Sequence, residues 1–532
     1  MKHLTFTLTA IMLAVLLSGT SCKLIKKKLA GKSDDRLRGV LNHRSNLPFD
    51  SNLVFKFYRT YPELNKYRKD VELVYREHKY TQIWYDGKGI VEFGQTLYGK
   101  VKSLNVEGVS SKFPYQAKID GIFDNDVENT LSQTETDLMM TNLYLFYAGK
   151  VIKGLDDTTT TAMGWLLPRK QVSYTVLLDS VISDPGLIDR NDSILFIQYY
   201  KLRDFLKRYR EIEKKGGWKP IDLDPKLKAY KPGDTAKAIK QIRERLFLTG
   251  DIRQNNGSNK YDAELEDAVR MFQQRNGFNP GKSILPKLIN EMNIPVGDLI
   301  KKIIINMERC RWISPEFARA KAYIVVNIPS FKLNRVRNSK SEFESPVVVG
   351  TNVTKTVIFS GMLTYIVFSP YWVLPKSIID KEVKPGMAKN KNYLNNHNME
   401  WKNGIVRQKP GKNNSLGLVK FIFPNADDIY MHDTPAKSLF SKESRAFSHG
   451  CIRVGKSRDL AVEILKDDPA WSPEKIDAAI HAGKESTCLL KNKMPVYIGY
   501  LTAWVNPQGV INFYNDIYQL DERLGELLFD EK

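Results

Sequence analysis

The stretch of this sequence that says most about its fold and chemistry is Phe447-Ser448-His449-Gly450-Cys451-Ile452-Arg453-Val454. A further histidine, His432, stands nineteen residues before the cysteine, in the run Tyr430-Met431-His432-Asp433-Thr434-Pro435. A neutral thiol is a weak nucleophile and needs a base such as imidazole to become reactive near pH 7. The sequence therefore predicts Cys451 as a nucleophile and His432 as its general base and acid.

The neighbours of Cys451 suit the same chemistry. Gly450 lets the backbone turn sharply or approach a ligand closely because it has no Cβ. Arg453 carries a planar cation suited to a substrate carboxylate, although a structural ion pair explains it too. Two other interpretations of the cysteine stay open. Cys451 is a buried structural thiol in one, and in the other a zinc ligand with His432 and His449, although His-x-Cys is an unusual ligand spacing.

The run from Ser448 to Arg453, together with the preceding His432 segment, resembles the active-site signature of the L,D-transpeptidases of bacterial cell walls, which carry a YkuD-type catalytic domain. The resemblance covers roughly residues 225 to 525 and is to the long, multidomain branch of the family. It extends through Asn306-Met307-Glu308-Arg309, Val326-Asn327-Ile328-Pro329-Ser330, Ser369-Pro370-Tyr371-Trp372, Arg407-Gln408-Lys409-Pro410-Gly411, Leu416-Gly417-Leu418-Val419-Lys420-Phe421, Phe423-Pro424-Asn425 and Thr502-Ala503-Trp504.

This resemblance implies that Cys451 attacks the carbonyl of the third residue of a peptidoglycan tetrapeptide and expels the terminal D-alanine. The amine of an acceptor stem then resolves the acyl-enzyme and forms a 3→3 cross-link, with no cofactor or metal. Backbone N–H groups near Gly450 and Cys451 are the expected oxyanion donors. His449 is expected to orient the loop or polarise the thioester, and Ser448 to brace the turn. Tyr430 and Trp372 line the cleft or belong to the core.

Two alternative functions stay open. Water resolves the same acyl-enzyme in an L,D-carboxypeptidase, which differs only in its acceptor. A non-catalytic lipoprotein that binds the cell wall is the other, and it is favoured by the tether and a small helical module.

A chain of 532 residues is too long for one core, so several domains are expected. The predicted fold is multidomain α+β, with helical parts followed by a mostly β catalytic domain. Its predicted parts are a lipoprotein-type signal peptide over 1–22, a tether over 23–48, a helical scaffold over 49–225, a peptidoglycan-binding-like domain over 226–296, and the catalytic domain over 300–525 with a capping insertion at about 376–410.

Local patterns support these parts. A helical stripe that packs on a partner helix is predicted from Tyr200, Leu202, Phe205, Leu206 and Tyr209. In the small module, Asp234 and Asp262 are predicted to cap two helices, and Gly277 to end the second. Strands are predicted at 323–328, 347–349, 419–423 and 429–431.

The N-terminal sequence predicts export. A largely apolar stretch from Leu4 to Leu17 is followed by small residues and Cys22, a pattern that resembles a lipobox with Gly19 as a departure. Cys22 is the predicted lipidation site, and the enzyme is expected to face the periplasm on a membrane anchor, with Lys23 favouring the outer membrane. Cys310 and Cys488 remain as one possible disulfide pair.

The formal net charge of +21 invites a nucleic-acid partner, which an exported protein rarely meets. Peptidoglycan stem peptides, a donor tetrapeptide and an acceptor stem, together with lipid headgroups are the expected anionic partners. A basic surface without a specific role is the alternative, and no protein partner is predicted.

Overall fold

The computed structural model describes residues 47, 49–86, 88–124, 131–190 and 194–529. These divide into two compact units. One combines the described residues up to Ser103 with Ser111–Ala148 and Val172–Asp189. The other combines Leu104–Ser110, Gly149–Gln171 and the described residues from Arg190 onward. The predicted signal peptide, most of the tether and Cys22 lie outside the described residues.

The first unit is helical around the central helix α7 (Gln133–Tyr147), which is buried on nearly all sides. Ser132 and Glu135 form a reciprocal capping box that fixes its start. Around it lie α3 (Asn52–Thr60), α4 (Arg68–Glu77), α5 (Glu92–Lys102), α6 (Gln116–Phe123), α9 (Tyr174–Ser183) and the short pair β1 (Tyr85–Asp86) and β2 (Gly89–Ile90). The buried Asp137 carboxylate accepts hydrogen bonds from the backbone of Ile83 and Trp84 and so ties α7 to this hairpin.

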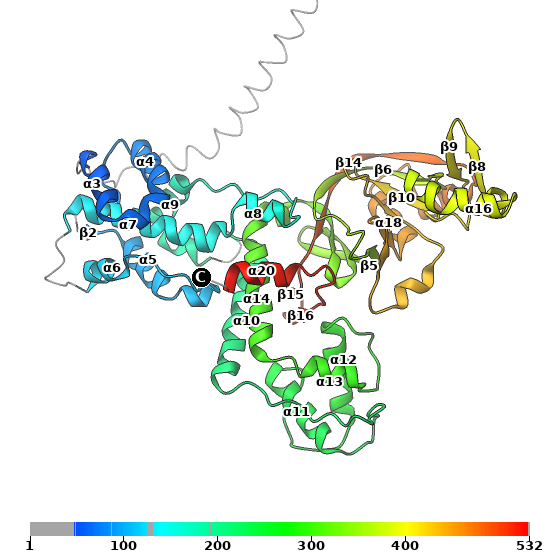
Figure 1. Cartoon of the computed structure of the whole chain (residues 1–532), viewed down its shortest axis with the longest axis horizontal. Helices are drawn as coiled ribbons and strands as arrows, with labels where there is room; N and C mark the ends of the chain where they lie inside the picture. The colour runs from blue at the N-terminus through cyan, green and yellow to red at the C-terminus, as the bar shows by residue number, and fades with distance from the viewer. Residues whose placement is uncertain (1–46, 48, 87, 125–130, 191–193, 530–532) are drawn as a thin grey trace, which may run out of the picture. The chain divides into compact units, whose positions relative to one another are not determined.

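In the second unit, α10 (Ile197–Lys214) lies beside α14 (Val296–Trp312) (Figure 1). Tyr200, Leu202, Leu206 and Tyr209 are buried on one face of α10, as the helical spacing predicts. The predicted partner helix is therefore α14. This helix is itself held by buried polar contacts, including the ion pair between Arg311 and Glu308.

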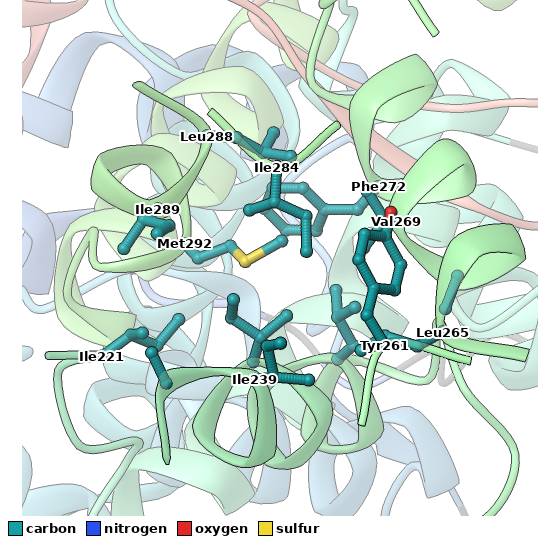
Figure 2. Close-up of a cluster of buried hydrophobic side chains, with 14 of the residues drawn as sticks. Ile221, Ile239, Tyr261, Leu265, Val269, Phe272, Ile284, Leu288, Ile289 and Met292 are labelled. Carbon is teal, nitrogen blue, oxygen red and sulfur yellow. The ribbon is translucent and has the colours of Figure 1, made fainter. Parts of the chain in front are cut away.

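The small helical module consists of α11 (Lys237–Thr249), α12 (Ala263–Arg275) and α13 (Pro286–Met292) around one apolar core (Figure 2). Asp262 caps α12 by accepting a hydrogen bond from the Leu265 amide, as predicted, and Gly277 follows its end with φ +77°. The prediction for Asp234 is wrong. Its carboxylate accepts from the Lys231 amide, because the chain stays extended through Ala236 and α11 begins at Lys237.

A nine-stranded mixed sheet forms the centre of the predicted catalytic domain. Its order is β12-β5-β13-β11-β10-β6-β14-β3-β4, and a further pairing of β4 with β5 closes it on itself. Closure removes the unpaired edges of an open sheet. The strands are β3 (Ala322–Asn327), β4 (Lys332–Arg337), β5 (Lys340–Gly350), β6 (Ser360–Phe368), β10 (Val419–Ile422), β11 (Met431–His432), β12 (Ala446–Ser448), β13 (Ile452–Val454) and β14 (Ser486–Gly499).

The segment predicted as a capping insertion has an apolar core of its own. Leu374, Val383, Met399 and Val406 are buried together, with Trp372 packed against them, so Trp372 belongs to this core. The elements here are β7 (Trp372–Val373), α15 (Lys376–Ile378), a π-helical turn (Ile379–Val383), α16 (Lys384–Lys389), α17 (Tyr393–Asn396), β8 (Met399–Lys402) and β9 (Ile405–Gln408).

The last described segment packs back on the second unit through β15 (Ala503–Val505), β16 (Ile511–Phe513) and α20 (Leu520–Phe529). Asp521 forms a buried ion pair with Arg309 of α14. Cys310 and Cys488 are both free thiols, so the possible disulfide between them is not formed. Within the described residues, no helix is both long enough and apolar enough to span a bilayer.

Candidate active site

Strand register brings the predicted nucleophile and base to one face of the sheet. β11 and β13 run parallel, with Met431 opposite Ile452 and His432 opposite Arg453. Side chains alternate along a strand, so Met431 and Ile452 enter the core while His432 and Arg453 lie on the opposite face. Cys451 directly precedes β13 and Tyr430 directly precedes β11, where the Ile452 amide donates to the Tyr430 carbonyl at 3.1 Å.

The loop that carries Cys451 depends on a glycine and a serine. Gly450 has φ +115°, a backbone conformation that side chains with a Cβ rarely adopt. The buried Ser448 hydroxyl donates to the Cys451 carbonyl at 2.6 Å and accepts from the Gly450 amide at 3.2 Å. Ser448 therefore braces the turn, and the Gly450 amide is occupied. Among the described contacts the Cys451 amide has no acceptor.

The hydroxyl groups of Thr354, Thr356 and Tyr518 support this loop through hydrogen bonds. Thr354 donates to the Ser448 carbonyl at 2.9 Å, and Thr356 donates to the Gly450 carbonyl at 2.7 Å. The Thr356 amide in turn donates to the hydroxyl of Tyr518, which donates to the Gly350 carbonyl at 2.8 Å. These residues are not adjacent to the site in sequence, and no local sequence signal points to them.

His432 is buried, and its ring has a defined tautomer. Nδ1 lies within hydrogen-bond distance of the Asp433 carbonyl oxygen, which only accepts, so Nδ1 carries the proton and Nε2 keeps its lone pair. Burial and the positive charge of Arg453 lower the pKa of His432 to about 4. The imidazole is therefore neutral at pH 7 and able to accept a proton.

Asp433 keeps the base segment in place. Its carboxylate accepts from the Leu418 amide at 3.0 Å and pairs with Lys437. Both contacts hold this segment in place, and neither indicates a role for Asp433 in proton transfer.

Cys451 is half-buried and rests in the thiol form. Burial raises its pKa, while the backbone N–H and the hydroxyl of Tyr430 act in the opposite direction by hydrogen bonding to the sulfur. The thiol donates to the Asp428 carbonyl at a sulfur–oxygen distance of 3.8 Å. Within the described residues, no hydrogen bond joins Sγ to His432.

The sequence interpretation missed Lys420. It lies on β10 directly opposite His432, and its Nζ lies 3.9 Å from the ring centroid of Tyr430. Tyr430 is in turn in edge contact with the His432 ring. In sequence, Lys420 stands within a run that carries the resemblance and interrupts the apolar residues of its strand, but neither signal reveals its neighbours.

The two remaining predicted residues, His449 and Arg453, differ in exposure. His449 is exposed, and Arg453 is half-buried, with its Nε buried and without a hydrogen-bond partner. Among the described residues, no cluster of three or more His, Cys, Asp or Glu side chains has the arrangement of a metal site. A buried nucleophile loop, a neutral imidazole and nearby cations are an arrangement suited to acyl transfer through a thiol.

Residues 321–471 match the family model described as the YkuD L,D-transpeptidase catalytic domain. The chain carries an L,D-transpeptidase catalytic domain. Residues 69–206 match a second model, described as a scaffold domain.

A Haemophilus influenzae protein described as "Putative L,D-transpeptidase" is 33% identical over 249 residues, which cover 43% of this chain and 50% of the relative. The chain thus spans half the length of this curated relative.

Two solved structures of L,D-transpeptidases are also similar to this chain. L,D-transpeptidase 1 of Mycobacterium tuberculosis is 13% identical, with 34% of this chain and 60% of that chain covered and a TM-score of 0.17. An L,D-transpeptidase of Stackebrandtia nassauensis is 14% identical, with 52% and 95% covered and a TM-score of 0.20.

Proposed function

We propose that this protein is a peptidoglycan L,D-transpeptidase that forms 3→3 cross-links through an acyl-enzyme on Cys451. The observation that carries the proposal is the register of β11 and β13, which puts a neutral, proton-accepting His432 on the same face as Cys451 within a matched L,D-transpeptidase domain. The proposed substrates are a donor tetrapeptide and an acceptor stem.

In the first step the Cys451 thiol leaves the Asp428 carbonyl, and His432 Nε2 takes its proton as Sγ attacks the carbonyl carbon of the third residue. The Cys451 amide, which has no acceptor within the described residues, is suited to hold the developing oxyanion. His432 then returns the proton to the leaving amine of D-alanine as the carbon–nitrogen bond breaks. Proton transfer of this kind typically contributes about 10²–10⁴-fold in rate.

In the second step the side-chain amine of the acceptor stem attacks the thioester. The new amide bond forms, the carbon–sulfur bond breaks and Cys451 is released as a thiol. Water in place of the amine would make the protein an L,D-carboxypeptidase.

The test is incubation of the purified protein with a disaccharide-tetrapeptide, followed by mass analysis of protein and products. We expect an acyl-enzyme and a dimer that has lost one D-alanine, both absent in Cys451→Ala. Cys488→Ala is the matched control, because it removes a buried thiol on β14. Tripeptide without dimer would support the carboxypeptidase, and no Cys451-dependent product would contradict the enzyme and favour a wall-binding protein.

We further propose that Cys22 is lipidated and that the protein faces the periplasm from a membrane anchor. The proposal rests on the sequence alone. Mass analysis of the N-terminal peptide from cells is expected to show a lipid on Cys22, and Cys22→Ala is expected to release the protein from the membrane fraction. An unmodified Cys22 in the mature protein would contradict it.

A further inference from the structure

Two cations flank the base across neighbouring strands. Lys420 on β10 and Arg453 on β13 are the direct register partners of His432 on β11. All three side chains share one face of the sheet, since register partners lie on the same side. With about 4.8 Å between neighbouring strands, roughly 10 Å separates the two Cα atoms, which lets these long side chains reach one small ligand between them.

Neither cation has an acidic partner. Within the described part of the chain, no ion pair involves Lys420 or Arg453, and Arg453 Nε is buried without any hydrogen-bond partner. Burial lowers the pKa of both groups. Most other buried arginines of this unit do have carboxylates, as Arg309 pairs with Asp521 and Arg335 with Glu342, whereas Arg245 donates to the Met292 carbonyl. A half-buried cation without a counterion is costly, so Lys420 and Arg453 are exceptions that need a reason.

The acidic groups nearby do not supply the missing charge. Asp433 is occupied by Lys437, and the Glu485 carboxylate accepts from the Tyr371 amide. The exposed Asp428 contacts the Cys451 thiol through its carbonyl, and its carboxylate, like that of Glu485, attracts Lys420 without forming an ion pair within the described residues. Lys420 Nζ instead packs on the Tyr430 ring, which offers a weak attraction in place of an anion.

Both cations also act on the reacting groups. Each of them favours the thiolate of Cys451 electrostatically, and each disfavours the protonated form of His432. In the free enzyme their charge therefore favours loss of the proton from Cys451 but opposes acceptance of that proton by His432. An anion bound between them would remove this opposition.

We propose that Lys420 and Arg453 together bind the C-terminal carboxylate of the donor stem peptide. The substrate then supplies the anion that the site lacks, and His432 becomes a better proton acceptor only once a donor is bound. The inference rests on the proposed function and names the donor chemistry it requires, a peptide with a free carboxylate on the residue that leaves. Departure of that residue carries the anion away and restores the free site.

A first experiment tests the cation pair without any turnover. Cys451 is alkylated with iodoacetate, which is anionic, and with iodoacetamide, which is neutral, at one pH, so that the thiolate fraction cancels in the ratio of the two rates. We expect Lys420→Met and Arg453→Met each to lower this ratio by about tenfold, and Lys420→Arg to keep it. Lys493→Met, which removes an exposed lysine of β14, is the matched control and leaves the ratio unchanged. An unchanged ratio in both cation variants would overturn the proposal.

A second experiment identifies the anion. Donor stems with a C-terminal carboxylate and with a C-terminal carboxamide are compared by kcat/KM. The wild type is expected to prefer the carboxylate by at least about tenfold, and Arg453→Met and Lys420→Met to lose most of this preference, while Lys420→Arg retains it. Equal use of both donors by the wild type would overturn the proposal.

The two experiments separate the inference from the function on which it rests. If the cation variants change the alkylation ratio but neither donor is turned over, the transpeptidase proposal fails. The assignment of the bound anion as the donor carboxylate then fails as well. If donors are turned over but substitution of Lys420 and Arg453 changes neither the alkylation ratio nor the preference for the carboxylate donor, the function stands and only the inference fails. Lys420→Arg guards against misfolding, since it keeps the charge and nearly the volume.

Discussion

At the scale of single residues, the two reacting groups of the site are both uncharged near pH 7. Burial raises the pKa of Cys451, and burial together with Arg453 lowers that of His432. The resting enzyme is therefore a thiol beside a neutral imidazole. This state differs from a preformed thiolate–imidazolium pair and leaves activation to the encounter with substrate.

The low pKa of His432 makes a prediction about pH. Because the group is protonated only below about pH 4 in the folded protein, against about 6.5 for a free imidazole, it stays a competent base as the pH falls well below 6. The acid limb of kcat/KM, which reports the free enzyme, is expected to have its midpoint near pH 4.

Arg453→Met should move this midpoint upward, because Arg453 disfavours the imidazolium. A wild-type midpoint at or above 6.5 would contradict the assignment.

A second prediction concerns Gly450. An added Cβ meets nothing closer than the Lys355 carbonyl at 3.7 Å, so the cost of Gly450→Ala lies in the backbone, at φ +115°. Strain of this kind costs about 1–3 kcal/mol and would shift the Cys451 loop. We expect kcat/KM to fall by at least about tenfold, a loss of about 1.4 kcal/mol in transition-state stabilisation.

Gly509→Ala is the control, because Gly509 also has a positive φ and lies in the turn between β15 and β16. It is expected to lower the thermal midpoint slightly and to keep activity. Full activity of Gly450→Ala would contradict the role given to the loop.

At the scale of elements, the sequence predicted where strands lie better than it predicted which strands pair with one another. Short apolar runs located β3, β10 and the end of β5, and the run at 429–431 overlaps β11 only at Met431. The stripe on α10 predicted a helical partner. Pairing is non-local, and it is what places Lys420 beside His432. Spacing suggested Cys451 and His432 together, but Thr356 and Tyr518 reach the loop only through the folded sheet.

The error at Asp234 has a local cause. Asp234 is a good capping residue by type, but an isolated bridge between Thr235 and Lys260 keeps the chain extended just after it. Tertiary pairing thus moved the helix start, which propensity alone does not reveal.

A third prediction concerns the insertion around α16. A Cβ on Gly386 would collide with the ring of Tyr393, which stacks on His397. Gly386→Ala is expected to loosen the insertion by about 1–3 kcal/mol, seen as faster limited proteolysis between residues 376 and 410.

Adding Tyr393→Ala should cost less in the Gly386→Ala background than in the wild type, because the collision is relieved. Gly281→Ala is the control for a glycine that has room for a Cβ and no positive φ. Additive effects of Gly386→Ala and Tyr393→Ala would contradict the packing described.

At the scale of the whole molecule, α14 is the element on which the second unit is assembled. It meets α10 and α20, and its Asn306 side chain donates to the Thr502 hydroxyl. At its end, the buried Glu308 carboxylate accepts from Arg311, Trp312 Nε1 and the Leu155 amide. One carboxylate therefore fixes the end of α14 and joins it to the segment at Leu155.

A fourth prediction follows for Glu308→Ala. The change leaves the buried Arg311 guanidinium without its counterion, which typically costs about 3–5 kcal/mol. We expect a large fall in the denaturant midpoint of the second unit, followed by Trp fluorescence. Glu316→Ala, which removes an exposed acid a short way along the chain, should change the midpoint little. Similar midpoints for the two variants would contradict the structural role of Glu308.

The contact of Tyr518 with the floor of the Cys451 loop has a consequence for the order of synthesis. Tyr518 is made well after Cys451 and His432, yet its hydroxyl joins Gly350 to Thr356 beneath the loop. A ribosome-bound chain that contains Cys451 and His432 but not yet Tyr518 therefore lacks this support beneath the Cys451 loop. We expect the Cys451 thiol to be unreactive in such unfinished chains and to become reactive only when the polypeptide is nearly complete.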